Sequence, residues 1–308
     1  MVLISLSTYA QQDTVWRNGG LATLNFNQTN LTNWAAGGEN SISATALLNL
    51  FANYKKNRMA WDNAIDLAYG ILKPGEKDVR KNEDKIDFLS KLGYDANGQN
   101  KLFYTMLFNF KSQFTDGFNY PNDTTEILVS RFAAPAYFLI SLGLDYKPNK
   151  DLSVFISPLT AKITMVNDQD LADAGAFGVE KASYDALGVK IEDGEKLRTE
   201  FGAYFNLKFQ KDVVTNVNVL TKLDLFSNYT ENPQNIDVNW EVLVAMKINK
   251  VLTASINTQL IYDDDIDIQE YDTVNGFRVP KTNPDGSLVA GPRVQFKEVL
   301  GIGLAYKF

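Results

Sequence analysis

Acidic and basic residues recur at alternate positions along several segments of the sequence. Successive side chains of a β-strand point to opposite faces, so charges two or four residues apart share one face. The face that carries these charges holds both signs in nearly equal numbers. It comprises Asp62, Asp66, Asp87, Asp95, Asp145, Glu200, Asp224 and Glu241 against Lys91, Lys111, Lys162, Arg198, Lys208, Lys222 and Lys247.

These residues allow two interpretations, either as members of a functional site or as solvated and paired lining residues. Charges of both signs in a confined space are expected to pair with one another. A strongly selective ion pore would instead show rings of one sign. We predict ten lumen-lining residues: Asp62, Asp66, Asp87, Lys91, Lys111, Lys162, Lys208, Lys222, Asp224 and Glu241.

Catalytic chemistry finds little support in these residue types. Asp62 and Asp66 would lie about 13 Å apart on one strand face, which is too far for a glycosidase-like carboxylate pair. The chain has no His and no Cys, so His-based catalysis and thiolate sites are excluded. No G-x-S-x-G motif is present. We therefore expect neither an enzyme nor a cofactor.

An acidic run is the one candidate for metal binding. Asp263, Asp264, Asp265 and Asp267 follow one another closely, and oxygen-rich clusters suit Ca²⁺ or a divalent ion that bridges lipopolysaccharide. The spacing is not that of an EF-hand. The alternative is an ordinary solvated acidic loop.

Composition narrows the class of protein further. The chain has 308 residues, 45% of them hydrophobic, and a net charge of -7; its mean hydropathy is -0.20 and its pI is about 4.8. This acidic balance argues against nucleic acid as a partner. No run of eighteen apolar residues exists, so the sequence predicts no transmembrane helix.

The stretch from Leu300 to Phe308 alternates between large apolar residues and small or polar ones. This period of two predicts a strand with one lipid-facing side, as in the closing strand of a transmembrane β-barrel. We interpret the outward residues at its end as an assembly signal: Leu304, Tyr306 and Phe308.

Similar alternation elsewhere predicts an all-β fold, an antiparallel transmembrane β-barrel of about twelve strands with short periplasmic turns and long extracellular loops. One turn is expected at Lys211-Asp212, and a change of parity at Pro158 predicts a β-bulge. We expect arginine to be costly at lipid-facing Leu142 and tolerated at lumen-facing Ser141. The alternative fold, a soluble β-sandwich, would need neither the recurring aromatics at strand ends nor the asymmetry of the loops.

The first ten residues end in Thr8-Tyr9-Ala10 after a short apolar run. This pattern is typical of the end of a secretory signal, although it also fits a first strand. We therefore expect a residual signal peptide over residues 1–10 and a single barrel domain over residues 11–308.

Four motifs resemble those of an uncharacterised family of outer-membrane β-barrels from Bacteroidota, a domain of unknown function. They are N-W-A-A-G-G-E-N-S-I-S from Asn33, W-D-N-A-I-D-L-A-Y-G from Trp61, S-P-L-T-A-K-I-T from Ser157 and G-A-F-G-V from Gly175. The resemblance implies the barrel fold and a location in the outer membrane of a Gram-negative bacterium. It implies no reaction.

Two functions from different classes remain open at this point. One is a narrow passive channel for small solutes, and the other is a non-transporting scaffold or accessory subunit of an outer-membrane complex. The expected partners are outer-membrane lipids, lipopolysaccharide, the barrel assembly machinery and other outer-membrane proteins.

Overall fold

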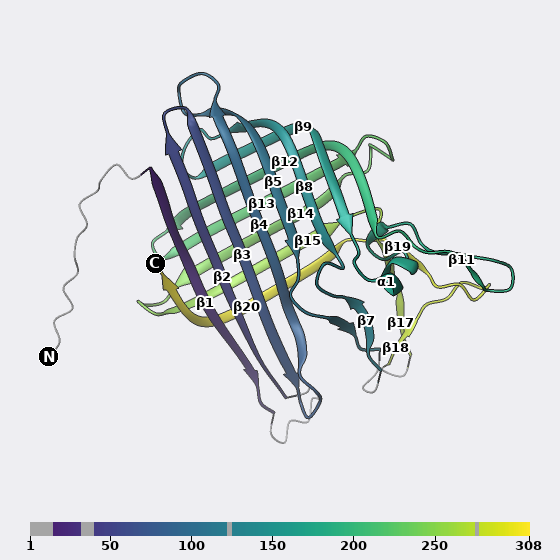
Figure 1. Ribbon diagram of the computed structural model, residues 1–308. Helices are drawn as coiled ribbons and strands as arrows, with labels where there is room; N and C mark the ends of the chain where they lie inside the picture. The colour runs from purple at the N-terminus through teal and green to yellow at the C-terminus, as the bar shows by residue number, and fades with distance from the viewer. Residues whose placement is uncertain (1–14, 32–39, 122–124, 275–276) are drawn as a thin grey trace.

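Twelve antiparallel strands close into a barrel in the computed structural model, which describes residues 15–31, 40–121, 125–274 and 277–308 (Figure 1). Each strand pairs with its neighbours along the ring, and the last returns to the first. In ring order they are β1 (Trp16–Thr29), β2 (Ser41–Lys56), β3 (Met59–Pro74), β4 (Arg80–Asp95), β5 (Leu102–Ser112), β8 (Ala136–Tyr146), β9 (Leu152–Met165), β12 (Leu197–Val214), β13 (Val217–Asn228), β14 (Asp237–Lys247), β15 (Leu252–Tyr262) and β20 (Gln295–Lys307).

Tight turns join strands at one end of the barrel, which we call the turn end. The expected turn at Lys211-Asp212 is wrong, because β12 continues to Val214 and the chain reverses at Thr215-Asn216. Asn216 occupies the left-handed region there, with φ of 64°, and asparagine tolerates that conformation better than most residues. The opposite end, the loop end, carries the long connections.

The predicted bulge at Pro158 is confirmed by the strand pairing. The register of β8 with β9 shifts between Leu142 and Leu144, and that of β9 with β12 shifts between Gly202 and Tyr204. Proline cannot donate to a ladder, so an irregularity at this position is expected. Outward residues on β9 change parity across the bulge, from Ile156 to Leu159.

The outer surface of the barrel is apolar, with aromatic rings gathered near the turn end. Trp16 lies 5.2 Å from Tyr54 and 5.8 Å from Trp61 between ring centroids. Tyr94 and Tyr104 are both exposed on directly opposite positions of β4 and β5. An exposed apolar band flanked by aromatic residues is typical of a lipid-facing barrel surface.

The long connections at the loop end contain folded elements. These are β6 (Gly117–Asn119), β7 (Ile127–Ser130), α1 (Gln169–Asp173), the 3-10 turn η1 (Ala176–Gly178), β10 (Ser183–Tyr184), β11 (Lys190–Glu192), β16 (Asp267–Gln269), β17 (Tyr271–Val274), β18 (Phe277–Pro280) and β19 (Ala290–Pro292). Within the described ranges, no helix is long and apolar enough to cross a membrane.

Helix α1 is fixed to the barrel rim by capping and by a small apolar core. Asp168 caps the helix by accepting a hydrogen bond from the Leu171 N–H at 3.1 Å. The helix packs on the barrel rim through Leu171, which is buried with Val166 and Val179. Hydrogen bonds from Lys190 and other donors lower the pKa of Asp173 to about 2, so its carboxylate holds the loop at neutral pH.

The expected signal segment, residues 1–10, lies outside the described residues, as do residues 33–39 of the first family motif, which spans 33–43. The single barrel domain over residues 11–308 stays a prediction.

Candidate functional site: the charged lumen

Ion pairs join opposite walls of the barrel through its interior. Asp66 on β3 contacts Lys222 on β13, and Lys85 Nζ on β4 lies 2.7 Å from Glu241 Oε1 on β14. The two strands of each pair stand six positions apart in the twelve-strand ring, which is the greatest separation the ring allows. Both contacts can form only across the lumen.

These contacts require the barrel to be flattened at their height. A round barrel of twelve strands, spaced about 4.8 Å apart and tilted about 40°, would be roughly 24 Å wide. A lysine and a carboxylate residue joined end to end span only about 12 Å between their Cα atoms. The two walls are therefore drawn together, and side chains occupy the space between them.

A second group of contacts centres on Asp224 of β13. Its carboxylate accepts hydrogen bonds from the Tyr204 hydroxyl at 2.6 Å and from the Asn206 amide at 2.8 Å, and Lys111 Nζ lies 3.2 Å away. The Asn206 side-chain oxygen accepts a hydrogen bond from Lys91 Nζ at 2.8 Å. Strands β4, β5, β12 and β13 are thus tied together inside the barrel.

Asp62 and Asp87 have partners of their own. Asp62 lies 2.5 Å from Lys147 Nζ near the turn end. Asp87 accepts a hydrogen bond from the Asn109 amide at 2.7 Å and lies 3.8 Å from Lys85 Nζ. Each carboxylate is therefore neutralised by a different lysine, and Asp62 and Asp66 do not act together.

An apolar cluster fills part of the lumen beside this network. Leu107 and Phe155 are fully buried, and Tyr204 and Phe226 are buried with them. Sequence alternation did not single out these residues, because an inward-facing aromatic residue cannot be told from a lipid-facing one without the register. The lumen is a packed interior on this side.

A third group of charges lies toward the loop end. Lys162 Nζ is 2.6 Å from Asp237, 3.4 Å from Glu200 and 3.4 Å from Asp263. Its side chain reaches from β9 to β14, three positions away in the ring, as the contact with Asp237 at the start of β14 shows. This one cation therefore offsets several carboxylates.

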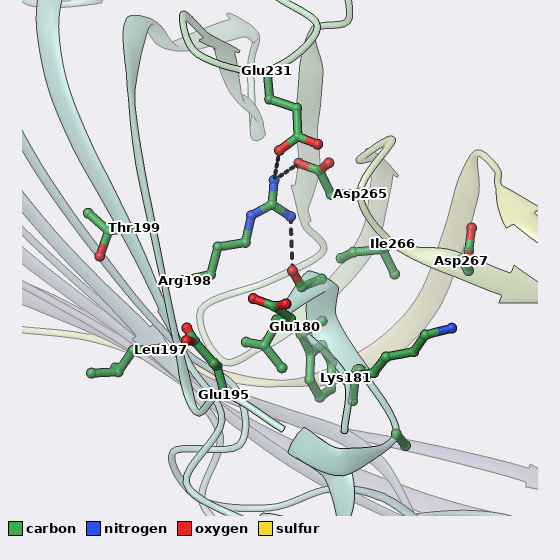
Figure 2. Close-up of a pocket in the computed structure, with 16 residues that line it drawn as sticks. Glu180, Lys181, Glu195, Leu197, Arg198, Thr199, Glu231, Asp265, Ile266 and Asp267 are labelled. Carbon is green, nitrogen blue, oxygen red and sulfur yellow. Dashed lines mark hydrogen bonds and ion pairs between the residues drawn. The ribbon is translucent and has the colours of Figure 1, made fainter. Parts of the chain in front are cut away.

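Above this group is a pocket of about 860 Å³, lined by the chain around η1 and by residues at the starts of β12 and β16. Arg198 projects into it, where its guanidinium contacts Asp265 and Glu231 and donates to the Gly178 carbonyl at 3.2 Å (Figure 2). Glu180 and Glu195 also line the pocket. Acidic side chains therefore predominate in the pocket, and its arginine is already engaged.

The structure does not bring the candidate metal ligands together. Asp263 contacts Lys162, Asp264 accepts a hydrogen bond from the Asn235 amide at 2.6 Å, and Asp265 contacts Arg198. Asp267 begins β16. In the part of the chain that the structure describes, no group of three or more acidic side chains is placed to hold a metal ion.

Sequence reasoning missed Lys85, Lys147 and Asp237. Lys85 lies within β4, Asp237 begins β14, and Lys147 directly follows β8. Extending the alternation by two residues from Asp87, or by four from Glu241, would have found Lys85 and Asp237. Among the predicted residues, Lys208 differs from the rest, because no ion pair joins it to another described residue. Its ladder neighbour is Lys222.

Comparison with known proteins adds a family match and several similar structures. The model of a family described as "Protein of unknown function (DUF3078)" matches residues 26–118, a range that contains the motifs at Asn33 and Trp61. No curated protein matches the chain.

Among solved structures, the chain is similar to the translocator domain of the autotransporter NalP from Neisseria meningitidis, with 11% identity, 98% of this chain and 91% of that chain covered, and a TM-score of 0.39. It is also similar to an outer-membrane channel from Pseudomonas putida F1, with 10% identity, 99% and 100% coverage, and a TM-score of 0.38. The chain is similar to the NanC porin as well, with 8% identity, 94% of this chain and 100% of that chain covered, and a TM-score of 0.34.

Proposed function

We propose that this protein is a barrel of the outer membrane of a Gram-negative bacterium whose lumen forms a narrow passive channel for small solutes. The observation that carries the proposal is the set of ion pairs between opposite walls, Asp66 with Lys222 and Lys85 with Glu241. They leave a polar but constricted interior inside a lipid-facing wall.

The location is supported by the outer surface. Outward side chains such as Leu142, Ile156 and Ile302 are half exposed or more on a closed barrel, and water would disfavour so much contiguous apolar surface. Outer-membrane lipids and lipopolysaccharide are the partners that would cover it. The barrel assembly machinery would be the partner during insertion.

The balance of charge in the lumen supports weak selectivity. Lys111, Lys162 and Lys222 each face carboxylates at contact distance, so these charges do not form a selective ring of one sign. A solute would have to pass between paired side chains, which restricts the passage to small molecules. The proposal assigns no residue a catalytic role.

Conductance of the purified protein in a planar bilayer tests the proposal. We expect a small, weakly selective conductance that rises when Lys111 and Lys222 are both changed to Ala, because both side chains reach across the lumen. The matched control is Lys56→Ala with Lys250→Ala, which removes two exposed charges at the turn end and should leave conductance unchanged. A large wild-type conductance with strong ion preference would contradict the balanced lumen.

The second candidate, a non-transporting scaffold, has its own supporting observation. The buried cluster of Leu107, Phe155, Tyr204 and Phe226 fills one side of the lumen, and folded elements project from the loop end (Figure 1). If neither the wild type nor the Lys111/Lys222 variant conducts under conditions in which a control porin does, the scaffold function is favoured. Its partners would then be other outer-membrane proteins.

A further inference from the structure

The barrel closes through an unusually short seam between β1 and β20. Six ladder pairs join the two strands, from Leu21 with Lys307 to Phe26 with Ile302, and Gly20 and Phe308 exchange two further backbone hydrogen bonds. The same register would place Gln28 opposite Leu300. Within the described residues, however, no ladder pair joins β1 beyond Phe26 to β20.

The two strands separate because β20 bends at the seam. They lie side by side near the C-terminal end of β20 and then diverge, β1 continuing with β2 and β20 turning to follow β15 (Figure 1). Gly303 lies at the close approach, where a Cβ atom would stand 2.2 Å from the Leu24 carbonyl oxygen. Glycine in a strand commonly marks such a bend.

Beyond the last pair, β1 is accessible from both sides. Asn27, Gln28 and Thr29 are all exposed, although consecutive residues point to opposite faces of the wall. Their counterparts by register on β20 are Gly301, Leu300 and Val299, and Leu300 is 61% exposed. The segments Asn27–Thr29 and Lys297–Leu300 pair with β2 and β15 on their other sides but not with each other, and we call their facing edges the open edge.

The open edge lies within the apolar band of the barrel. Leu300 is eight residues from Phe308, which at about 3.3 Å per residue and a tilt of about 40° corresponds to a height of roughly 20 Å. The band itself is about 25 Å tall. Phe296, four residues before Leu300, also points outward and is 64% exposed.

Unpaired backbone groups at this depth are costly in hydrocarbon, where no water can satisfy them. Polar side chains point outward on both strands at the open edge. On β1, Gln28 follows the outward-facing Phe26, and on β20, Glu298 follows the outward-facing Phe296. At its base, Asn25 is 4% exposed, and its side-chain oxygen has no hydrogen-bond partner among the described residues. The edge therefore offers hydrogen-bonding groups to a polar head beside apolar surface for a chain.

We propose that the seam between β1 and β20 is a lateral opening, in which the acyl chain of a membrane lipid inserts between the two strands. The inference rests on the proposed membrane location, but not on conductance along the barrel axis. The lipid's polar head hydrogen-bonds at the open edge, where the exposed side chains of Gln28 and Glu298 lie. Its chain passes the gap that the missing ladder pairs leave.

Disulfide trapping tests whether the seam is open, and the chain contains no native cysteine. In Gln28→Cys with Leu300→Cys, the two cysteines would be directly opposite if the ladder continued. In the control, Leu24→Cys with Leu304→Cys, they are directly opposite in the observed ladder. Since a disulfide needs Cα atoms within about 7 Å, we expect oxidation to cross-link the control pair and to leave the Gln28/Leu300 pair reduced.

Quenching by brominated phosphatidylcholine tests whether acyl chains enter. Three single variants on β1 carry a bimane label: Phe26→Cys faces lipid, Asn27→Cys faces inward at the open edge, and Thr23→Cys faces inward within the ladder. We expect the label at 27 to be quenched as strongly as that at 26, and the label at 23 severalfold less. Thr29→Cys provides a second inward position if the Asn27 variant does not fold.

The outcomes separate this inference from the proposed location. Weak quenching at 26 would overturn the location itself, whereas strong quenching at 26 with equally weak quenching at 23 and 27 would overturn only the lateral opening. Cross-linking of the Gln28/Leu300 pair as efficiently as the control would also overturn it. So would a dimer cross-linked through Gln28→Cys alone, which would show that a second copy covers the edge.

Discussion

The wall formed by β2 and β3 and the seam formed by β1 and β20 belong to the same barrel but are built differently. Sixteen ladder pairs join β2 to β3 without interruption, from Ser41 with Pro74 to Lys56 with Met59. Six join β1 to β20. Both interfaces carry exposed apolar side chains outside, so the difference lies in backbone pairing and not in the character of the surface.

This difference indicates where the barrel can change shape. Where ladder hydrogen bonds hold a strand to both neighbours along its length, the strands cannot move apart. An added atom there must therefore clash with the neighbouring strand. A seam with a short ladder can widen at the cost of few hydrogen bonds. We expect perturbations of equal chemical size to have larger effects in the fully paired wall than at the seam.

Adding one methyl group at a close approach should show the largest effect. In the wall, where β8 approaches β9 closely at the bulge, a Cβ at Gly143 would stand 2.1 Å from the Ile156 carbonyl oxygen, and at the seam a Cβ at Gly303 would stand 2.2 Å from that of Leu24. We expect Gly143→Ala to lower the free energy of unfolding by about 3 kcal/mol or more, and Gly303→Ala by about 1 kcal/mol. Urea titration in lipid vesicles measures both.

The control for these glycines is Gly291→Ala, because a Cβ there has no neighbour within 4 Å. It should leave the free energy of unfolding unchanged. Equal losses for Gly143→Ala and Gly303→Ala would show that the seam is as rigid as the wall.

Removing a lysine should have the next largest effect. Lys222→Ala leaves Asp66 without its cross-lumen partner, and we expect a loss of roughly 3 kcal/mol. Lys297→Ala removes the contact with Glu83 at 3.0 Å, but the Lys297 side chain is 42% exposed, so we expect less than about 1 kcal/mol.

The double variant Asp66→Leu with Lys222→Met sharpens this comparison. Replacing both members of a buried pair by apolar residues is often nearly neutral, so the double variant should be more stable than Lys222→Ala alone. If it is instead the less stable of the two, the pair contributes directly to stability and does not merely neutralise a buried charge.

Arginine on the outer surface should distinguish the two regions by their surroundings. Leu142 is 50% exposed on a fully paired strand, and Leu142→Arg should cost about 2–4 kcal/mol in a bilayer. Glu298→Arg places the same side chain at the open edge, where the polar head of the proposed lipid would lie, and should cost less than about 1 kcal/mol. Similar costs at both positions would show that only hydrocarbon surrounds the edge.

The structure does not support the expectation that arginine is tolerated at Ser141. Ser141 is fully buried, and its hydroxyl accepts a hydrogen bond from the Thr160 hydroxyl at 2.8 Å. Arginine there would overfill a packed interior, which is why the comparison uses Glu298.

The fold could be predicted because each strand of a barrel wall has its own pattern of alternating residues, which can be recognised without knowing its neighbours. Alternation along segments such as Leu300 to Phe308 follows directly from one face in lipid and one inside, and the twelve-strand antiparallel barrel is confirmed. The bulge at Pro158 was equally local. The turn after β12 was misplaced, because its signal is a single asparagine, Asn216, rather than a charged pair.

The lumen and the seam could be predicted only in part, because they depend on contacts between distant strands. Alternation indicates that Asp66 and Lys222 face inward, but their pairing depends on the flattening of the barrel. Leu107 and Phe155 look lipid-facing by residue type until the register is known. The short ladder of the seam leaves no mark in either strand alone apart from the polar residues Gln28 and Glu298.

Removing paired aromatic rings should have the smallest effect on stability and a larger one on assembly. Tyr306 and Phe308 point outward beside the seam, with ring centroids 5.8 Å apart and exposures of 69% and 56%. Rings at the membrane interface anchor a strand at a set depth, and β20 has few ladder pairs with β1 to hold it there. We expect Tyr306→Ala with Phe308→Ala to insert into vesicles severalfold more slowly, while stability falls by about 1 kcal/mol.

The matched control removes an equivalent pair from the fully paired wall. Tyr94 and Tyr104 are directly opposite each other and exposed by 49% and 63%. Because uninterrupted ladders fix their strands, Tyr94→Ala with Tyr104→Ala should insert at nearly the wild-type rate, as followed by the change in electrophoretic mobility between unfolded and folded forms. If both double variants are slowed equally, the rings act through general contact with lipid, and the seam has no special dependence on its anchors during closure.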